Sequence, residues 1–340
     1  MKALVKYALG PDGVELREIQ KPAPAENELL LKILAAGICA SDIHALHDRR
    51  GVVMPVALGH EYVGVVEAMG SQVEGFSVGD MVTGLPACYS CGTCQYCLAG
   101  EVTLCKQRKS VGTHKNGAMA EYMVCPAKYC FKIPEDDPDK LKYAMAEPFA
   151  CAVRGVYEHL TVLPGDIAVV SGPGTIGLFI VQCLKDRGAH VIVSGLPMDQ
   201  PRLEHALKLG AEKAVTSAEE LQEYLSKVAP LGADIAVECS GAGPSLDTCL
   251  KVAKTHGQVL VMGIFGKPAT VDMGSIFMKE LNITASNSTA MSSWKIALDL
   301  LYSGKIDIGH ALSMKLPLAE WRKGFDAVID KTALKVLLIP

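Results

Sequence analysis

The stretch that decides the fold is Ile167-Ala168-Val169-Val170-Ser171-Gly172-Pro173-Gly174-Thr175-Ile176-Gly177. It joins an apolar strand to an apolar helix through a turn with the spacing Gly-x-Gly-x-x-Gly. Gly172 permits a tight turn, Gly174 lets the backbone approach a pyrophosphate, and Gly177 permits close helix packing. The N–H groups of Thr175 and Ile176 would add positive potential at the helix start. The stretch therefore predicts a dinucleotide-binding loop, the alternative being a glycine turn that binds nothing.

From about residue 162 onward, apolar strands alternate with helical segments. Ser217 and Glu220 form a capping-box pattern that marks one helix start. Such alternation is typical of an α/β fold, in which a doubly wound parallel sheet carries helices on both faces. The six expected strands are Ile167–Ser171, His190–Ser194, Lys213–Thr216, Asp234–Cys239, Gln258–Met262 and Leu281–Ala285. The expected helices are Ile176–Arg187, Pro201–Leu209, Ala218–Val228, Ser245–Thr255 and Ser292–Tyr302.

Roughly the first 150 residues have a different sequence pattern, in which short runs of alternating apolar and polar residues are broken by Gly and Pro. Expected strands there are Val14–Ile19, Leu29–Ala35 and Tyr62–Ala68, and a further strand, Lys335–Ile339, lies near the C-terminus. No Ser/Gly linker separates these two parts of the chain. We therefore expect two domains that pack on each other, with a ligand-binding cleft between them.

Composition excludes several classes of protein. The 340 residues carry 33 Lys and Arg against 37 Asp and Glu, so nucleic acid and anionic membranes are not expected partners. The longest uncharged run, Ile167–Leu184, is interrupted by glycine and proline, which indicates a buried strand and helix and no membrane span. The N-terminus resembles a strand and not a secretory signal. We expect a cytoplasmic protein, in which 12 cysteines indicate metal binding or burial and not disulfides.

Four cysteines have the spacing Cys91-x2-Cys94-x2-Cys97-x7-Cys105. Four thiolates held by tight turns close a tetrahedral shell around zinc and leave no position for water, which is typical of a structural site. The alternative is a coincidental cluster of buried thiols. Cys88 precedes Cys91 with the same two-residue spacing. Because Gly92 and Gly100 frame the other four cysteines, we exclude Cys88 from the zinc site.

Further ligand-type residues are scattered through the first half. Cys39 opens the run Cys39–His44, His60 and Glu61 follow Gly59, and Glu147 precedes Pro148. Singly each residue type is ordinary. Together they supply a thiolate, an imidazole and two carboxylates, which suits a catalytic zinc with an open fourth position.

The position that decides between NAD and NADP departs from the usual pattern. About twenty residues after the glycine loop, where an acidic residue would bind the adenosine ribose, the chain has Gly195. Without that carboxylate a 2′-phosphate is not repelled, and Ser194 or Arg202 could hold it. Asp199 could instead reach back to the ribose, so both cofactors stay open.

These motifs together resemble the zinc-containing medium-chain dehydrogenase/reductase family, in its sorbitol (polyol) and threonine dehydrogenase branch. Besides the glycine loop and the four cysteines, the matching stretches are Gly37–His44, Gly59–Gly64, Val78–Val82, Ala120–Tyr122, Glu147-Pro148 and Glu238–Gly241. The resemblance implies a GroES-like β-rich catalytic domain at 1–152, with a zinc lobe at about 88–106. It also implies a Rossmann domain with a six-stranded sheet at 153–288, and a segment, 289–340, that completes the catalytic domain.

The resemblance also implies roles for individual residues. Cys39, His60 and either Glu61 or Glu147 would hold the catalytic zinc, and a second, structural zinc would bind the four cysteines. Ser41 would hydrogen-bond the substrate alcohol, and His44 would pass its proton onward. Ser240 and Gly263 are expected beside the cofactor, which is NAD or NADP.

The implied reaction transfers a hydride from a secondary alcohol, such as a polyol or sugar, to NAD(P), which leaves a ketone or aldehyde. Alternatives are an NADPH-dependent carbonyl reductase, a threonine-type amino alcohol dehydrogenase and a zinc-stabilised redox sensor without turnover. Against threonine, Arg154 replaces a common His, and an expected Asn is absent from Ala150–Ala152. Arg49, Arg50 and Arg154 could contact an anionic substrate, although solvated arginines are more common. Relatives form dimers or tetramers, so a homodimer or homotetramer is expected.

Overall fold

The computed structural model describes all residues from Met1 to Pro340. The chain divides into two compact units. Unit 1 comprises Met1–Glu147, Thr289–Tyr302 and Asp307–Pro340, and unit 2 comprises Pro148–Ser288 and Ser303–Ile306. The helices α4 and α9 have 12 residues each, and no helix has both the length and the apolarity that a membrane crossing requires.

Unit 2 contains a six-stranded, entirely parallel sheet with the order β11-β10-β9-β12-β13-β14. This order, with the first strand of the unit at the centre, is that of the Rossmann fold. The strands are β9 (Ile167–Ser171), β10 (His190–Ser194), β11 (Lys213–Val215), β12 (Ala233–Glu238), β13 (Ala253–Val261) and β14 (Asn282–Ala285). Together with the β-rich unit 1, this sheet confirms the predicted fold class.

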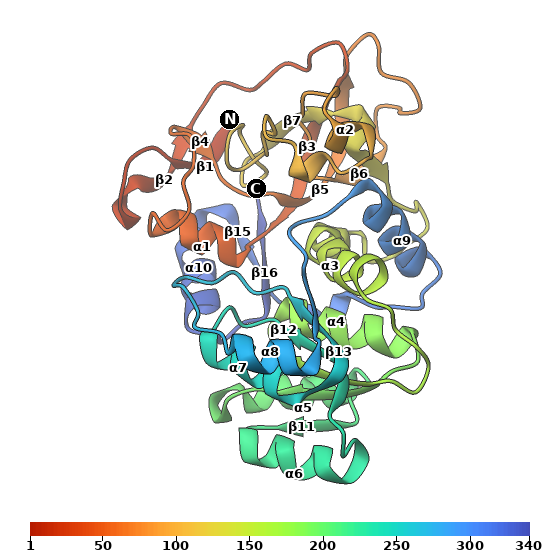
Figure 1. The fold of residues 1–340 in the computed structure, drawn as a ribbon. Coiled ribbons are helices and arrows are strands. Elements are labelled where there is room, and N and C mark those ends of the chain that lie inside the picture. Colours follow the sequence, from red (N-terminus) through yellow and green to blue (C-terminus); the bar gives the residue numbers. More distant parts are fainter. The chain divides into compact units, whose positions relative to one another are not determined.

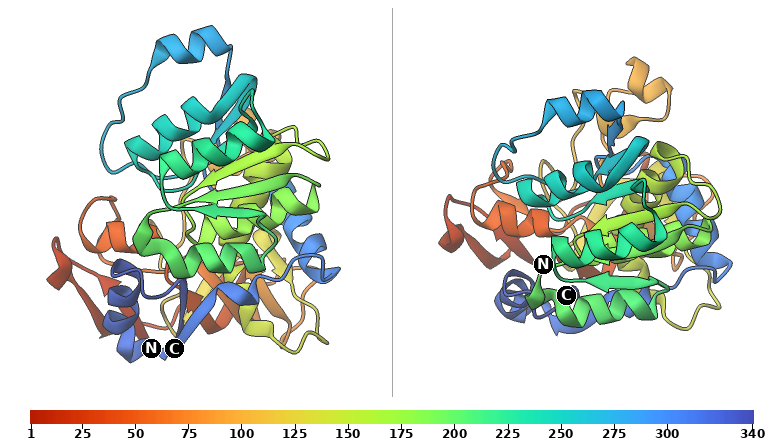
Figure 2. Two further views of the ribbon diagram at one scale, coloured as in Figure 1. Left: turned by 90° about the horizontal axis from the view of Figure 1, so that it is seen from below. Right: turned by 60° about the horizontal axis from the view of Figure 1, so that its bottom comes forward.

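Helices cover both faces of this sheet (Figure 2). They are α4 (Thr175–Asp186), α5 (Gln200–Lys208), α6 (Ala218–Val228), α7 (Gly243–Val252) and α8 (Met273–Lys279). The apolar faces of strands and helices meet in a core that includes Val169, Ile192 and Leu221, all at most 2% exposed. As the capping box predicts, the Ser217 side chain accepts a hydrogen bond from the Glu220 N–H at the start of α6.

Two sequence expectations about helices need correction. The helix expected at Ser245–Thr255 ends at Val252, and β13 begins at Ala253. Ala253 pairs with Ala233 of β12 across a register shift, so strand pairing replaces the last helical turn. Helix α8 was not expected, and it begins where the Asp272 side chain accepts a hydrogen bond from the Ser275 N–H.

Unit 1 is built from two sheets (Figure 1). The larger has the order β15-β16-β3-β5-β6-β8, with β7 also paired to β3, and the smaller has the order β2-β1-β4. The larger sheet consists of β3 (Glu28–Gly37), β5 (Glu61–Met69), β6 (Met81–Gly84), β7 (Tyr122–Pro126), β8 (Cys130–Lys132), β15 (Leu312–Pro317) and β16 (Lys335–Ile339). The smaller consists of β1 (Lys2–Lys6), β2 (Val14–Glu18) and β4 (Val56–Ala57). The pairing of β16 with β3 therefore joins the C-terminal segment to the N-terminal part of the chain.

Unit 1 also contains the helices α1 (Ala40–Leu46), α2 (Gln95–Leu98), α9 (Met291–Tyr302) and α10 (Trp321–Ile329). Helix α1 follows the end of β3 after a two-residue connection, and β5 begins directly opposite that end. This arrangement brings residues from distant parts of the sequence to one end of the larger sheet.

Candidate functional site

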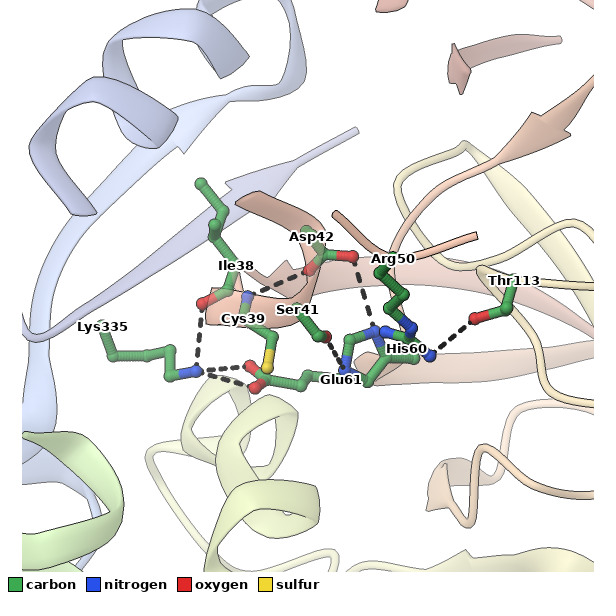
Figure 3. A network of polar contacts seen from close by, with 9 residues as sticks. All are labelled: Ile38, Cys39, Ser41, Asp42, Arg50, His60, Glu61, Thr113 and Lys335. Carbon is green, nitrogen blue, oxygen red and sulfur yellow. Dashed lines mark hydrogen bonds and ion pairs between the residues drawn. The ribbon is translucent and has the colours of Figure 1, made fainter. Parts of the chain in front are cut away.

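Cys39, His60 and Glu61 converge at the end of β3 (Figure 3). Gly37, the last residue of β3, pairs with Glu61, the first residue of β5, in antiparallel register. A Cβ at Gly37 would lie 2.1 Å from a Glu61 carboxylate oxygen, so only glycine leaves room for this carboxylate. One ligand atom from each of Cys39, His60 and Glu61 lies within 4.8 Å of the others. The strand pairing thus assembles a thiol, an imidazole and a carboxylate.

This donor set fits zinc. Sulfur, nitrogen and oxygen are the atoms that protein zinc sites use, and three protein ligands leave a fourth position open. His60 and Glu61 are buried, and Cys39 is half-buried. Burial therefore removes the imidazole and the carboxylate from water, whereas the thiol stays partly accessible to solvent.

Glu61 also faces a buried cation, which sequence reasoning missed. Lys335, the first residue of β16, donates hydrogen bonds to both Glu61 carboxylate oxygens at 2.7 Å and to the Ile38 carbonyl at 3.0 Å. Burial alone would lower the pKa of Lys335, but the negative charges of Glu61, Cys39 and Glu147 raise it above its usual value. The only sequence signal was one lysine at the head of an otherwise apolar strand.

Asp42 positions His60. One Asp42 oxygen accepts a hydrogen bond from the Cys39 N–H at 3.0 Å, and the other lies 3.5 Å from His60 Nδ1. Both side chains are buried, and each opposes the effect of burial on the other: the pKa of Asp42 is lowered and that of His60 is raised well above its usual value. A carboxylate behind a ligand histidine is a common device that orients the ring toward a metal. The spacing Cys39-x-x-Asp42 contains this capping arrangement, but it was not recognised from the sequence.

Of the other predicted catalytic residues, Ser41 lies at the cluster, whereas His44 and Glu147 lie outside it. Ser41 Oγ lies 3.3 Å from His60 Nε2, so Ser41 belongs to the cluster. His44 lies one turn further along α1 and makes no side-chain hydrogen bond with Ser41. Burial first, then the neighbouring cations Arg49 and Arg50, lower the pKa of His44. Glu147 is 6% exposed in the first turn of α3 (Ala146–Val153) and lies outside the group of three ligand atoms.

The four predicted cysteines form a second cluster around α2. Sulfur separations are 3.8 Å for Cys91–Cys97 and 3.6 Å for Cys94–Cys97 and Cys91–Cys105. A tetrahedral zinc with Zn–S bonds of about 2.3 Å places its sulfurs about 3.8 Å apart. Hydrogen bonds from the Thr93 and Cys94 backbone lower the pKa of Cys91 to about 6. The spacing of the four sulfurs therefore fits a tetrahedral zinc site.

In unit 2 the glycine loop connects β9 to α4 as predicted. Gly172 has a φ of +109°, and a Cβ at Gly177 would lie 2.0 Å from the Gly172 carbonyl oxygen. A Cβ at Gly174 would meet nothing within 4 Å, so this position is open to a ligand. The first N–H groups of α4 have no acceptor within the helix, so the loop supplies donors suited to a pyrophosphate.

A buried glutamate holds the neighbouring loop. Glu238, at the end of β12, accepts hydrogen bonds from the Ser240 N–H and hydroxyl, the Gly241 N–H and the Ser245 hydroxyl at 2.6–3.0 Å. Ser240 and Gly263 therefore lie together, since a Cβ at Gly263 would come within 2.4 Å of Glu238 Oε2. Sequence reasoning noted Glu238 only as part of a matching stretch and assigned it no role.

The residues near the expected ribose position follow β10. Ser194 and Gly195 are half-buried, and Arg202 is half-buried on α5. Asp199 is 7% exposed, and its carboxylate accepts a hydrogen bond from the Leu196 N–H at 3.1 Å. This bond gives Asp199 a local capping role in the loop.

Comparison with protein families identifies two matching regions. The alcohol dehydrogenase GroES-like domain matches residues 25–135, and the zinc-binding dehydrogenase domain matches residues 175–303. The first match contains Cys39, His60 and the four cysteines, and the second begins within the glycine loop.

Individual relatives match over the whole chain. A sorbitol dehydrogenase of Halalkalibacterium halodurans is 34% identical over 343 residues, which is 100% of this chain and 99% of the relative. A D-arabitol-phosphate dehydrogenase of Enterococcus avium is 36% identical over 345 residues, covering 99% and 97%. The crystal structure of a zinc-binding dehydrogenase from Sinorhizobium meliloti bound to NADP has a TM-score of 0.91 and 31% identity, covering 100% and 99%.

Proposed function

Because the chain belongs to the zinc-containing medium-chain dehydrogenase/reductase family, we propose that Cys39, His60 and Glu61 form its catalytic centre. The protein is an NAD(P)-dependent oxidoreductase that transfers hydride between an alcohol and the cofactor. The observation that carries the site assignment is the convergence of three zinc-type ligand atoms within 4.8 Å. Glu61 is favoured over Glu147 as third ligand, because only Glu61 belongs to that group.

Zinc at this centre would act as a Lewis acid that favours negative charge on the substrate oxygen. Ser41 lies beside His60, so its hydroxyl can hydrogen-bond a substrate hydroxyl there and relay its proton, accepting the substrate's proton while it gives up its own. His44 is the next acceptor on the same helix. Its lowered pKa keeps the imidazole neutral at pH 7 and able to take up a proton.

The nicotinamide cofactor would accept the hydride. In unit 2 the Gly172–Gly177 loop would bind its pyrophosphate through backbone N–H groups. Ser240 and Gly263 would border the same site, held by Glu238. Ser194, Gly195 and Arg202 would face the adenosine ribose, and the cofactor is NAD or NADP.

The second zinc has a structural role in this proposal. Cys91, Cys94, Cys97 and Cys105 would hold it in a closed shell, which predicts two zinc ions per chain. The proposed substrate class is a secondary alcohol of the polyol or sugar type. The names of two relatives, a sorbitol dehydrogenase and an arabitol-phosphate dehydrogenase, support this class.

Metal analysis combined with activity tests the proposal. Wild type should bind two zinc ions per chain and form NAD(P)H with a panel of polyols. Cys39→Ala should retain one zinc and lose activity, whereas the control Cys249→Ala, far from both clusters in sequence and buried in unit 2, should match wild type. If Cys39→Ala keeps two zinc ions and full activity, the proposed centre is wrong.

The same assay separates the remaining alternatives. Glu61→Gln should lose the catalytic zinc and Glu147→Gln should keep it; the reverse result would make Glu147 the third ligand. Cofactor binding with only the four-cysteine zinc and no turnover would identify a redox sensor.

We also propose an oligomeric state and a cellular location. Met273, Phe277 and Met278 on α8 are 65–77% exposed, and the neighbouring edge strand β14 carries Ile283, which is 44% exposed. Exposed apolar side chains beside an unpaired strand edge are typical of an interface, which supports a homodimer or homotetramer. None of the 12 cysteines forms a disulfide, which supports a cytoplasmic location.

A further inference from the structure

Two loops of unit 1 carry positive charge next to the catalytic cluster. The first follows α1, where the His44 carbonyl accepts hydrogen bonds from the Arg49 N–H at 2.8 Å and the Arg50 N–H at 3.2 Å. Arg50 Nη2 donates to Thr113 Oγ1 at 2.8 Å (Figure 3). The Val53 N–H donates to the Thr113 carbonyl at 2.8 Å. These bonds hold the Arg50 guanidinium against the second loop. Figure 3 shows the Arg50 and Asp42 side chains around His60, and the charge of Arg50 contributes to the lowered pKa of Asp42.

The second loop, residues 106–115, adds further donors. Arg108 uses one guanidinium nitrogen to donate to the Thr103 carbonyl, and a guanidinium has five N–H donors. His114 Nδ1 accepts a hydrogen bond from the Ser110 N–H at 3.2 Å, so the neutral ring carries its proton on Nε2. We name Arg49, Arg50, Arg108, Lys109 and His114 the cationic cluster.

No carboxylate neutralises the cationic cluster. The acidic residues nearest to Arg49 and Arg50 in the sequence are engaged elsewhere: Asp48 lies 2.7 Å from Lys6 Nζ, and Asp42 faces His60. Burial and, after it, repulsion by the Arg50 charge lower the pKa of Arg108. Burial and, after it, the positive charges of Arg108 and Arg50 lower the pKa of His114. Positively charged side chains that lie together, are partly buried and have no carboxylate counter-ion indicate a site for an anionic ligand.

We propose that Arg50, Arg108 and His114 form a subsite for the phosphate monoester of a phosphorylated polyol substrate. The inference rests on the proposed function, because it names the substrate class of the same site. Arginine guanidinium groups match phosphate oxygens in paired hydrogen bonds, which suits this ligand better than a neutral polyol. The pyrophosphate of the dinucleotide has its own loop in unit 2, so the cationic cluster is assigned to the substrate.

The test compares sorbitol 6-phosphate with sorbitol on the zinc-loaded full chain. Wild type should show a higher kcat/KM for sorbitol 6-phosphate, and the preference should fall as ionic strength rises. Arg50→Met and Arg108→Met should each reduce the ratio of the two kcat/KM values roughly 10- to 100-fold, the loss expected for a charged hydrogen bond. Arg50→Lys should recover part of it. The control Arg322→Met, which removes an exposed arginine of α10, should keep the wild-type ratio.

Calorimetric binding of sorbitol 6-phosphate to the same proteins separates this inference from the proposed function. Binding that weakens in Arg50→Met and Arg108→Met without any turnover would support the subsite and contradict the dehydrogenase assignment. The inference is overturned if wild type does not prefer the phosphorylated substrate, or if both variants lower the two kcat/KM values equally. It is also overturned if they instead raise the KM for NAD(P) and leave the ratio unchanged, since the cluster would then serve the cofactor.

Discussion

Removing the Lys335 ammonium by the substitution Lys335→Met should destabilise the protein strongly when the catalytic zinc is absent. All three ammonium protons are engaged, two with Glu61 and one with the Ile38 carbonyl, and Glu61 is 0% exposed. The methionine replaces most of the lysine stem, so the main effect is an unpaired buried carboxylate. Breaking a buried ion pair from one side costs about 3–5 kcal/mol. For a unit of this size, that corresponds to a decrease in Tm of roughly 6–20 °C.

The loss of stability should depend on whether zinc is bound. Zinc bound to Glu61 would replace the missing positive charge, so zinc-loaded Lys335→Met should lose less and should bind the catalytic zinc more tightly than wild type. The folded-state pKa of Lys335 is raised, so its contribution is fully present below 10.5 and is lost only as pH rises through the higher folded value. The contribution of Lys335 to wild-type stability should therefore be constant between pH 6 and about pH 9.

Thermal unfolding by circular dichroism measures this effect on protein that retains one zinc per chain after mild chelation. Lys315→Met, at an exposed position on β15, is the matched control. Lys335→Arg should recover much of the Tm, and the double variant Lys335→Met/Glu61→Met should recover it by removing both charges. If metal-depleted Lys335→Met unfolds within about 1 °C of the control, the assigned ion pair does not stabilise the protein.

Three further outcomes follow from the other sites. Cys97→Ser should lower the zinc content by one ion per chain and reduce Tm, and an unchanged metal content would contradict a four-cysteine site. Ile283→Lys at the β14 edge should reduce the molar mass measured by light scattering to that of a monomer, and an unaltered mass would exclude this edge as the interface. Because burial and the cations Arg49 and Arg50 lower the pKa of His44, activity should fall only below pH 6.5. Arg49→Met should move this acid limb to higher pH, and a pH profile that does not move would argue against His44 as the proton acceptor.

The strands and helices were largely predictable, because each depends on residues close in sequence. The strand Ile167–Ser171 and the helix Ala218–Val228 match the prediction in both bounds. The predicted end of the helix after Ser245 was wrong, because β13 begins at Ala253, where pairing with β12 decides the conformation. Helix α8 has only seven residues, which is too short for its periodicity to identify a helix from the sequence.

The positioning residues were less predictable than the ligands. Cys39, His60 and the four cysteines have residue types and spacings that indicate metal on their own. Lys335 is 274 positions away from Glu61, and nothing local signals their contact. Glu238 binds residues two to seven positions away, but its role depends on its burial, which the sequence pattern does not reveal.

The local sequence therefore determined the alternation of strands and helices, the glycine loop and the two sets of zinc-type ligands. Each of these depends on side-chain chemistry and spacing within a short segment, where physical constraints act over a few residues. Only the tertiary structure decided that Lys335 faces Glu61, that Asp42 stands behind His60 and that Arg50 meets the loop at Thr113. Those contacts arise when β16, β3 and β5 pair and bring distant charges into a buried volume. Electrostatic energy there depends on distance and burial, and neither is encoded in a local pattern.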